Sequence, residues 1–282
     1  TTRRTTGIAN ESLKVGMDGR WGGFSGSLDD EVNEGVRRGY NQPENMLRPS
    51  SDADTQVDHK ITKDNTRVVV VTEIEPGNTV EGTVAAKGGG SENKAKFAML
   101  NPSDSIVDWV LKTVPTMGAG WCPPGMLGIG IGGSAEKAMV LAKEALMQPI
   151  DMHELKARGP SNRLEELRIE LYDKVNALGI GAQGLGGLST VLDVKILDYP
   201  THAASLPVAI IPNCAATRHA HLRLDGSGLA NLAAQAHADS PDVHWSPAPD
   251  PPPLALDAQT HAQVPSRQRG GPRPPQRRTR TA

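Results

Sequence analysis

Apolar residues recur every three or four positions in four segments of the chain, which is the spacing of one face of a helix. The clearest example begins at Ser27, a residue type that caps helix starts, and places Val32, Val36 and Tyr40 on one face. Acidic residues follow the cap, where the helix dipole favours them. The pattern predicts four helices, at residues 27–40, 102–114, 134–146 and 161–179.

Shorter runs rich in Val, Ile and Leu predict strands between these helices. The predicted strands cover residues 66–74, 78–86, 192–197 and 207–211. Helices and strands are mixed along the chain without a regular strand–helix–strand alternation. The order of elements therefore favours an α+β, or mixed α/β, domain over a doubly wound parallel sheet.

Three glycine clusters interrupt the predicted elements, at residues 87–94, 128–137 and 179–187. Loops of this composition expose successive backbone N–H groups that can hold an anion. In the first cluster, "KGGGSENK", Lys87 and Lys94 add positive charge. The alternative is that the glycines permit tight turns and close backbone packing, and composition alone does not separate the two.

The second cluster contains G-x-G-x-x-G at Gly128, Gly130 and Gly133, directly ahead of a predicted helix. This is the spacing of a dinucleotide-binding fingerprint, but that fingerprint requires a preceding strand. Pro123 and Pro124 lie just before the glycines, and proline interrupts strand pairing. We therefore expect no strand before the glycines and no nicotinamide site.

Composition excludes several classes of protein. The 282 residues carry a formal charge of −2 and two cysteines, and no apolar run approaches the roughly 18 residues of a membrane helix. Two cysteines make no disulfide framework, so we expect a cytoplasmic protein with free or metal-binding thiols, without membrane association.

The end of the chain has a different composition from the rest. Prolines cluster from Ser246 onward, and residues 266–282 contain six arginines and no acid. Such a segment buries too little apolar surface to fold, so we expect a disordered Arg/Pro tail. Without it the chain is acidic, which argues against nucleic-acid binding by the domain; binding by the tail itself stays open.

One cysteine has cationic neighbours. Cys214 follows the predicted strand at 207–211 and is followed by Arg218, His219 and His221. Cations near a thiol lower its pKa and favour the thiolate, which is the reactive and metal-binding form. The sequence thus indicates a chemical role for Cys214.

Several long stretches resemble, in order and spacing, the N-terminal catalytic domain of class I fumarases. They include "KGGGSENK", "CPPGMLGIGIGGSAEKAMVLAKEAL", "LGIGAQGLGGLSTVLDVKI" and "PTHAASLPVAIIPNCAATRHAHLRLDGSG". This iron–sulfur hydro-lyase family also includes the α-type subunit of L-tartrate dehydratase. The resemblance implies a division into a leader outside the family, a catalytic domain, a linker and a tail, at residues 1–6, 7–230, 231–265 and 266–282.

The resemblance implies reversible hydration of fumarate to (S)-malate at a [4Fe–4S] cluster held by three cysteines. An open iron on such a cluster can act as a Lewis acid. Cys122 and Cys214 match two of the ligand positions, and Arg48, Gly90 and His202 match substrate-binding positions. Hydration of tartrate or mesaconate is the alternative within the same family.

The start of the chain departs from the family's Cys-Gln-Asp-Thr-Gly motif. With Gly7 on the motif's glycine, the acid position is occupied by Thr5 and the third cysteine position by Arg3. We therefore assign no catalytic acid in this chain. The family's C-terminal swivelling domain does not follow residue 265 either, so the expected partners are such a domain or a β-type subunit, and a second copy in a homodimeric complete enzyme.

Two explanations of these departures stay open. The chain is either a fragment of a class I fumarase gene with foreign residues at both ends, or a diverged, cluster-free relative that binds a C-terminal-domain partner. The intact interior motifs favour a fragment, and in either case we expect little activity from the chain alone.

Overall fold

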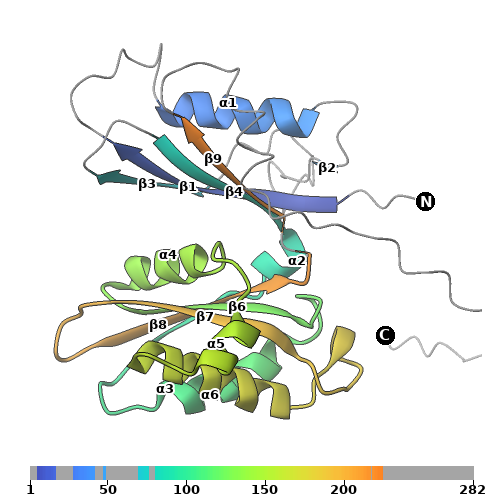
Figure 1. The fold of residues 1–282 in the computed structure, drawn as a ribbon, viewed down its shortest axis with the longest axis vertical. Coiled ribbons are helices and arrows are strands. Elements are labelled where there is room, and N and C mark those ends of the chain that lie inside the picture. The colour runs from blue at the N-terminus through green and yellow to red at the C-terminus, as the bar shows by residue number, and fades with distance from the viewer. Residues whose placement is uncertain are drawn as a thin grey trace, which may run out of the picture. The chain divides into compact units, whose positions relative to one another are not determined.

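Two β-sheets organise the part of the chain that the structure, a computed structural model, describes: residues 5–16, 28–41, 47–48, 69–75, 80–216 and 218–224 (Figure 1). The chain divides into two units, 1–240 and 241–282, and every described residue belongs to the first. The predicted linker and Arg/Pro tail lie outside the described residues.

The helices and strands follow one another in mixed order, as expected of an α+β protein. The helices are α1 (Leu28–Asn41), α2 (Gly89–Glu92), α3 (Ile106–Thr113), α4 (Ala135–Ala145), α5 (Met152–Arg158) and α6 (Arg163–Ala177), with 3₁₀ turns η1 (Val114–Met117) and η2 (Ala182–Gly184). The strands are β1 (Thr5–Gly16), β2 (Leu47–Arg48), β3 (Val69–Glu75), β4 (Val80–Gly88), β5 (Lys96–Leu100), β6 (Gly125–Gly132), β7 (Val191–Tyr199), β8 (Leu206–Cys214) and β9 (His219–Leu224). None of the described helices is long and apolar enough to cross a membrane.

Each sheet mixes parallel and antiparallel pairs. In the first sheet the order is β2-β1-β4-β9, β3 also pairs with β1, and β4 runs antiparallel to both of its neighbours. In the second sheet the order is β5-β8-β6-β7, with β6 parallel to β7 and antiparallel to β8. The mixed pairing confirms the predicted α+β class and excludes a doubly wound sheet.

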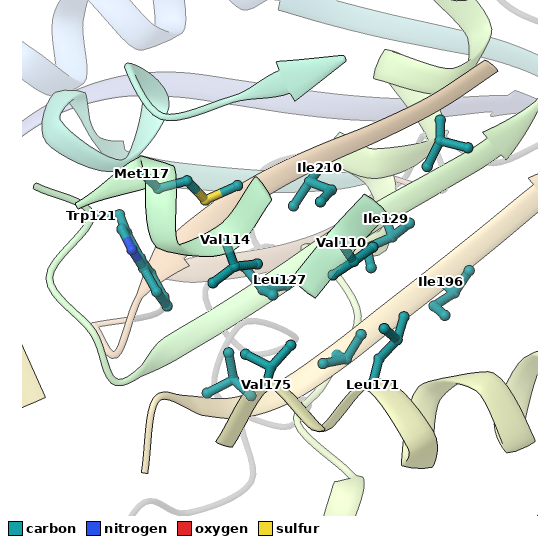
Figure 2. Close-up of a cluster of buried hydrophobic side chains, with 13 residues drawn as sticks. Val110, Val114, Met117, Trp121, Leu127, Ile129, Leu171, Val175, Ile196 and Ile210 are labelled. Atoms are coloured by element: carbon teal, nitrogen blue, oxygen red, sulfur yellow. The ribbon is translucent and has the colours of Figure 1, made fainter. Parts of the chain in front are cut away.

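The second sheet is covered on both faces, by α4 on one and by α3 and α6 on the other (Figure 1). Successive residues of β8 alternate between these faces: Ile210 packs towards α3 and α6, and Ile211 packs towards α4. Figure 2 shows Val110 of α3 and Leu171 of α6 gathered with Ile210 in one buried cluster. The helix predicted at 102–114 thus buries one apolar face, which includes Val110 and Val114.

The G-x-G-x-x-G segment is a strand rather than a loop. Gly128 and Gly130 lie inside β6, which starts directly after Pro124, so our expectation that the prolines exclude a strand was wrong. A Cβ atom at Gly130 would lie 1.9 Å from the carbonyl oxygen of Ala138 in α4. The glycines let α4 lie directly on the β6 backbone, and they form no phosphate-binding loop.

Four charged side chains form a closed network beneath β7. Asp193, fully buried on this strand, lies 3.2 Å from Arg168 of α6 and 3.3 Å from Lys195. Asp151, just before α5, accepts from the same two cations at 2.5 Å. Two acids therefore balance two bases, and together they join α5, α6 and β7.

Replacing one acid of this network should destabilise the fold strongly. Asp193→Ala leaves two buried cations with a single carboxylate, and we expect a loss of about 3 kcal/mol in the free energy of unfolding. Urea denaturation measures it. Asp198→Ala, at an exposed position of the same strand, is the matched control and should change stability little; equal effects of the two variants would contradict this account.

A second prediction concerns acid stability. Glu165 of α6 accepts hydrogen bonds from Arg158, Ser161 N and Ser161 Oγ, which lower the pKa of its carboxyl from 4.5 to about 2. Because the folded-state pKa is depressed, the stabilisation is present above pH 4.5 and is lost as the pH falls towards 2. In thermal melts, Glu165→Gln should lower the melting temperature at neutral pH. The difference in melting temperature between this variant and the wild type should vanish near pH 2. Glu166→Gln, at the exposed neighbouring position, is the matched control.

Candidate functional site

The topology brings the two cysteines to the same end of the second sheet. Cys214 is the last residue of β8, and its register partner is Gly125, the first residue of β6. Cys122 lies three residues ahead of Gly125, in a turn where its own backbone has a φ of 57°. Cys122 is exposed and Cys214 is half-buried.

The first sheet brings Gly90 to the same place. Gly90 lies in α2, directly after β4, and a Cβ atom there would lie 2.6 Å from the carbonyl oxygen of Gly120. Gly120 is two residues ahead of Cys122, so the K-G-G-G segment packs against the turn that carries this cysteine. Only glycine fits such an approach without moving one of the two backbones.

The backbone also places two further predicted positions near Gly90. Gly88, at the end of β4, pairs with Gly7 of β1, and Thr6 of β1 pairs with Arg48 of β2. Thr5, the acid position of the family motif, is the first residue of β1. Arg48 and Thr5 therefore lie at the end of the first sheet where α2 begins, whereas Arg3 lies outside the described residues.

His202 is not brought to this site within one chain. It lies in the loop between β7 and β8. At the start of this loop the carbonyl of Tyr199 accepts a hydrogen bond from the N–H of Gly133, which directly follows β6. His202 is therefore at the opposite end of β6 from Gly125. The eight residues of β6 span roughly 23 Å. Within one chain, His202 and Gly90 therefore lie at opposite ends of β6, and the role of His202 in substrate binding stays a prediction.

A buried ion network lies beside Cys214, and two of its members had no signal in the sequence. Lys87, at the end of β4, has a side chain 4 % exposed, 3.0 Å from Glu92 of α2. Glu92 also accepts from Lys143 of α4 at 2.5 and 2.7 Å. Glu92 and Lys143 are 51 positions apart in the chain, so no local pattern could have linked them.

Burial lowers the pKa of Lys87 to about 8, and the nearby Glu92 carboxylate opposes this shift. Lys87 lines a small cavity together with Asn213, the residue that precedes Cys214. Lys87 comes from the first sheet and thus lies near the end of β8 that carries Cys214.

The two histidines that follow Cys214 in the sequence lie on β9. His219 begins β9, and burial, together with His221, lowers its pKa and favours its neutral form. The His221 ring makes a hydrogen bond of 2.9 Å with Thr83 on the neighbouring strand β4. Both histidines belong to β9 of the first sheet, and whether they support a Cys214 thiolate stays a prediction.

The third glycine cluster docks on the Cys122 turn. The backbone N–H of Gln183 in η2 donates to the carbonyl of Pro123 at 2.7 Å, and Gly184 lies against Ala119. Gln183 has a φ of 55°, in the left-handed region that ordinary residues avoid. Such backbone strain persists where the surroundings fix it, here beside a cysteine whose own φ is also positive.

The thiols fit an iron–sulfur cluster only in part. Among the described residues, no three His, Cys, Asp or Glu side chains lie close enough to hold a metal ion, and the sequence contains two cysteines in all. Cys122 and Cys214 thus supply two of the three thiolates that such a cluster needs. A third would have to come from outside these 282 residues.

Comparison with known proteins gives a consistent result. A family model described as "Fumarate hydratase (Fumerase)" matches residues 4–223. The chain is 37% identical over 231 residues to the "Putative L(+)-tartrate dehydratase subunit alpha" of Methanocaldococcus jannaschii, covering 78% of this chain and 76% of that protein. It is also 35% identical over 154 residues to an L(+)-tartrate dehydratase subunit alpha of Escherichia coli, covering 54% of this chain and 49% of that protein. The chain thus spans about three quarters of the archaeal relative and about half of the bacterial one.

The strained turn beside Cys122 generates a stability prediction. Gln183→Gly relieves the left-handed backbone of η2, which offsets the entropy that glycine adds to the unfolded chain, so stability should change by less than about 0.5 kcal/mol. Gln183→Val places a β-branched residue at the same φ and should cost about 1–2 kcal/mol. Thermal melts compare the two variants. Equal losses would show that backbone conformation does not govern this position.

Proposed function

Because the chain belongs to the fumarate hydratase family, we propose that it is the catalytic domain of a hydro-lyase that converts fumarate and (S)-malate reversibly. The observation that carries this proposal is the convergence of Cys122, Cys214 and Gly90 on one turn, from segments more than thirty residues apart. The positions of Thr5 and Arg48 at the adjoining end of the first sheet support it.

The residues suit a dicarboxylate substrate. Addition of water to a carbon–carbon double bond beside a carboxylate builds negative charge on that carboxylate in the transition state, and fixed donors stabilise it. We propose that the Gly90 N–H and the Arg48 guanidinium bind the carboxylates, because an arginine matches a carboxylate with two parallel hydrogen bonds. Lys87, buried at the end of β4 just ahead of Gly90, adds a positive charge.

A [4Fe–4S] cluster on Cys122, Cys214 and a third thiolate would supply the Lewis acid for the substrate hydroxyl. This cofactor is part of the proposal. No step is assigned to a protein acid in this chain, since Thr5 stands at the motif's acidic position.

Tartrate dehydration is the second candidate, because both relatives above carry the name of L(+)-tartrate dehydratase subunit alpha. Tartrate differs from malate by one hydroxyl group, so the same carboxylate contacts serve both substrates. A site with a hydrogen-bond partner for that second hydroxyl would favour tartrate over malate.

The partners follow from the same comparison. The relatives are named as alpha subunits, and we propose that a β-type subunit or a C-terminal domain completes the site from outside the described residues. A homodimer and a cytoplasmic location remain predictions. If His202 contacts substrate at the Cys122 turn, it does so from a second copy of the chain, given the length of β6.

The direct test restores what the chain lacks. The variant Arg3→Cys, Arg4→Gln, Thr5→Asp rebuilds the motif, and a β-type subunit is added under anaerobic conditions with iron and sulfide. We expect near-background turnover from the unmodified chain, and bound iron with hydration of fumarate from the rebuilt one. Rates on fumarate, mesaconate and tartrate then identify the preferred acid.

Cys122→Ser and Cys214→Ser in the rebuilt protein are the matched controls, and each should remove iron and activity together. Robust turnover by the unmodified chain would overturn the claim that its site is incomplete. Full iron loading without turnover on any of the three acids would reject the hydro-lyase assignment.

A further inference from the structure

The loop between α6 and β7, residues 178–190, carries the two most exposed large apolar side chains among the described residues. Leu185 is 88 % exposed and Leu188 is 93 % exposed. The two residues are three positions apart, so their Cα atoms lie within about 11 Å of each other. Single exposed leucines are common on protein surfaces, but two that are almost fully exposed in one loop indicate a surface that another molecule covers.

The composition of the 178–190 loop is also unusual for a segment that faces water. Residues 182–189 are all exposed, yet the loop "LGIGAQGLGGLST" contains no charged residue. Loops that face only solvent are normally polar. A partner of this loop is therefore recognised by apolar contact rather than by ionic attraction.

Hydrogen bonds fix both ends of the 178–190 loop. The side-chain oxygen of Asn176 accepts from the backbone N–H groups of Thr190 and Val191, at 2.7 and 2.9 Å. The N–H of Gly181 donates to Thr190 Oγ1 at 3.2 Å, so the start of the loop is tied to its end. The exposed residues therefore project from a closed base.

Glycines let the loop fold back on itself. The N–H of Gly186 donates to the carbonyl of Ile180 at 2.8 Å, and a Cβ atom at Gly181 would lie 2.1 Å from the carbonyl carbon of Gly186. Compact surface loops whose ends are close in this way are frequently functional. A loop that is already ordered loses little conformational freedom when a partner covers it, which favours binding.

The 178–190 loop lies beside the turn that carries Cys122. Gln183 donates its backbone N–H to the carbonyl of Pro123 at 2.7 Å. Leu185 is two positions further along, within about 7 Å of Gln183 between Cα atoms. A molecule that covers Leu185 is therefore close to the Cys122 turn, where the described residues supply too few thiolates for a cluster. Any partner that completes the site must approach this same turn.

We propose that the 178–190 loop is a docking surface for the β-type subunit, which covers Leu185 and Leu188 with an apolar surface of its own and so brings the groups that this chain lacks to the Cys122 turn. The identity of the partner rests on the proposed function and on the alpha-subunit names of the relatives. The docking surface itself does not, because it follows from the exposure, composition and hydrogen bonds of the loop.

The affinity of the unmodified chain for the β-type subunit, measured by isothermal titration calorimetry, tests this surface. Leu185→Ser and Leu188→Ser should each weaken binding on the order of tenfold, because each removes a leucine side chain from an apolar contact. The loop is uncharged, so this fold-change should be the same at low and high salt. Met99→Ser is the matched control, since Met99 is 55 % exposed on β5 and pairs with Pro207, at the opposite end of β8 from Cys214. It should leave the affinity unchanged, and thermal melts establish that each variant is folded.

Hydroxyl-radical footprinting of the wild-type chain tests the same surface without a substitution. Oxidation of Leu185 and Leu188 should fall when the β-type subunit is bound, whereas oxidation of Met99 should not. Leucines that stay fully reactive in the complex would overturn the proposal, as would failure of the β-type subunit to bind the unmodified chain.

The remaining outcomes separate the occupant of the surface from the function of the site. Self-association of the chain alone that both leucine substitutions abolish would show a contact between two copies and would overturn the proposal. Wild-type affinity in both leucine variants, with fumarate hydration by the rebuilt protein, would reject the docking surface and retain the proposed function. Weakened binding in both variants, with no turnover on any of the three acids, would retain the docking surface and reject the proposed function.

Discussion

The direct contact between α4 and the backbone of β6 determines much of the described structure. A side chain at Gly128 or Gly130 would collide with carbonyl oxygens of α4 at about 2 Å, so the helix rests on the strand without intervening side chains. This close approach brings Lys143, on the last turn of α4, within reach of Glu92 in α2. The second sheet and the K-G-G-G turn are thereby connected through one ion pair.

Backbone contacts also define the position of Cys122. Gly90 packs on the carbonyl of Gly120, η2 donates to Pro123, and Gly125 has no room for a Cβ atom beside Asn213. The first and third glycine clusters of the sequence thus meet at one turn, whereas the second runs along β6 away from it. The sequence left open whether these glycines serve close packing or anion binding. Close packing accounts for most of them. Anion binding stays a prediction for the segment around Gly90.

The elements with regular apolar spacing were predicted well, and the glycine-rich strand was not. Val110 and Val114 on the predicted helix are fully buried, because a helical stripe specifies one face. β6 escaped prediction because a strand that packs by its backbone lacks the Val and Ile pattern by which strands are recognised. At the site, Cys122 and Cys214 were identified through the family resemblance. The ion pair of Glu92 and Lys143 could not be predicted from the sequence, since this contact depends on how close α4 lies to β6.

The position of His202 shows a different limit. The histidine precedes β8 and Cys214 ends it, so a strand nine residues long separates them, although they are close in sequence. Neighbouring motifs in a sequence need not share a site when a strand connects them. The strand predicted at 207–211 already separates His202 from Cys214 in the sequence.

The two buried ion networks and the glycines of β6 differ in how they can change during evolution. The balanced set of Asp151, Arg168, Asp193 and Lys195 can be exchanged for apolar residues only as a group, because each single step leaves a charge unpaired. Gly128 and Gly130 have no such route, since any side chain meets a helix backbone. Drift should therefore remove the ion network from distant relatives before it removes the glycines, and a search for remote members of this family gains more from the spacing of its glycines than from its charges.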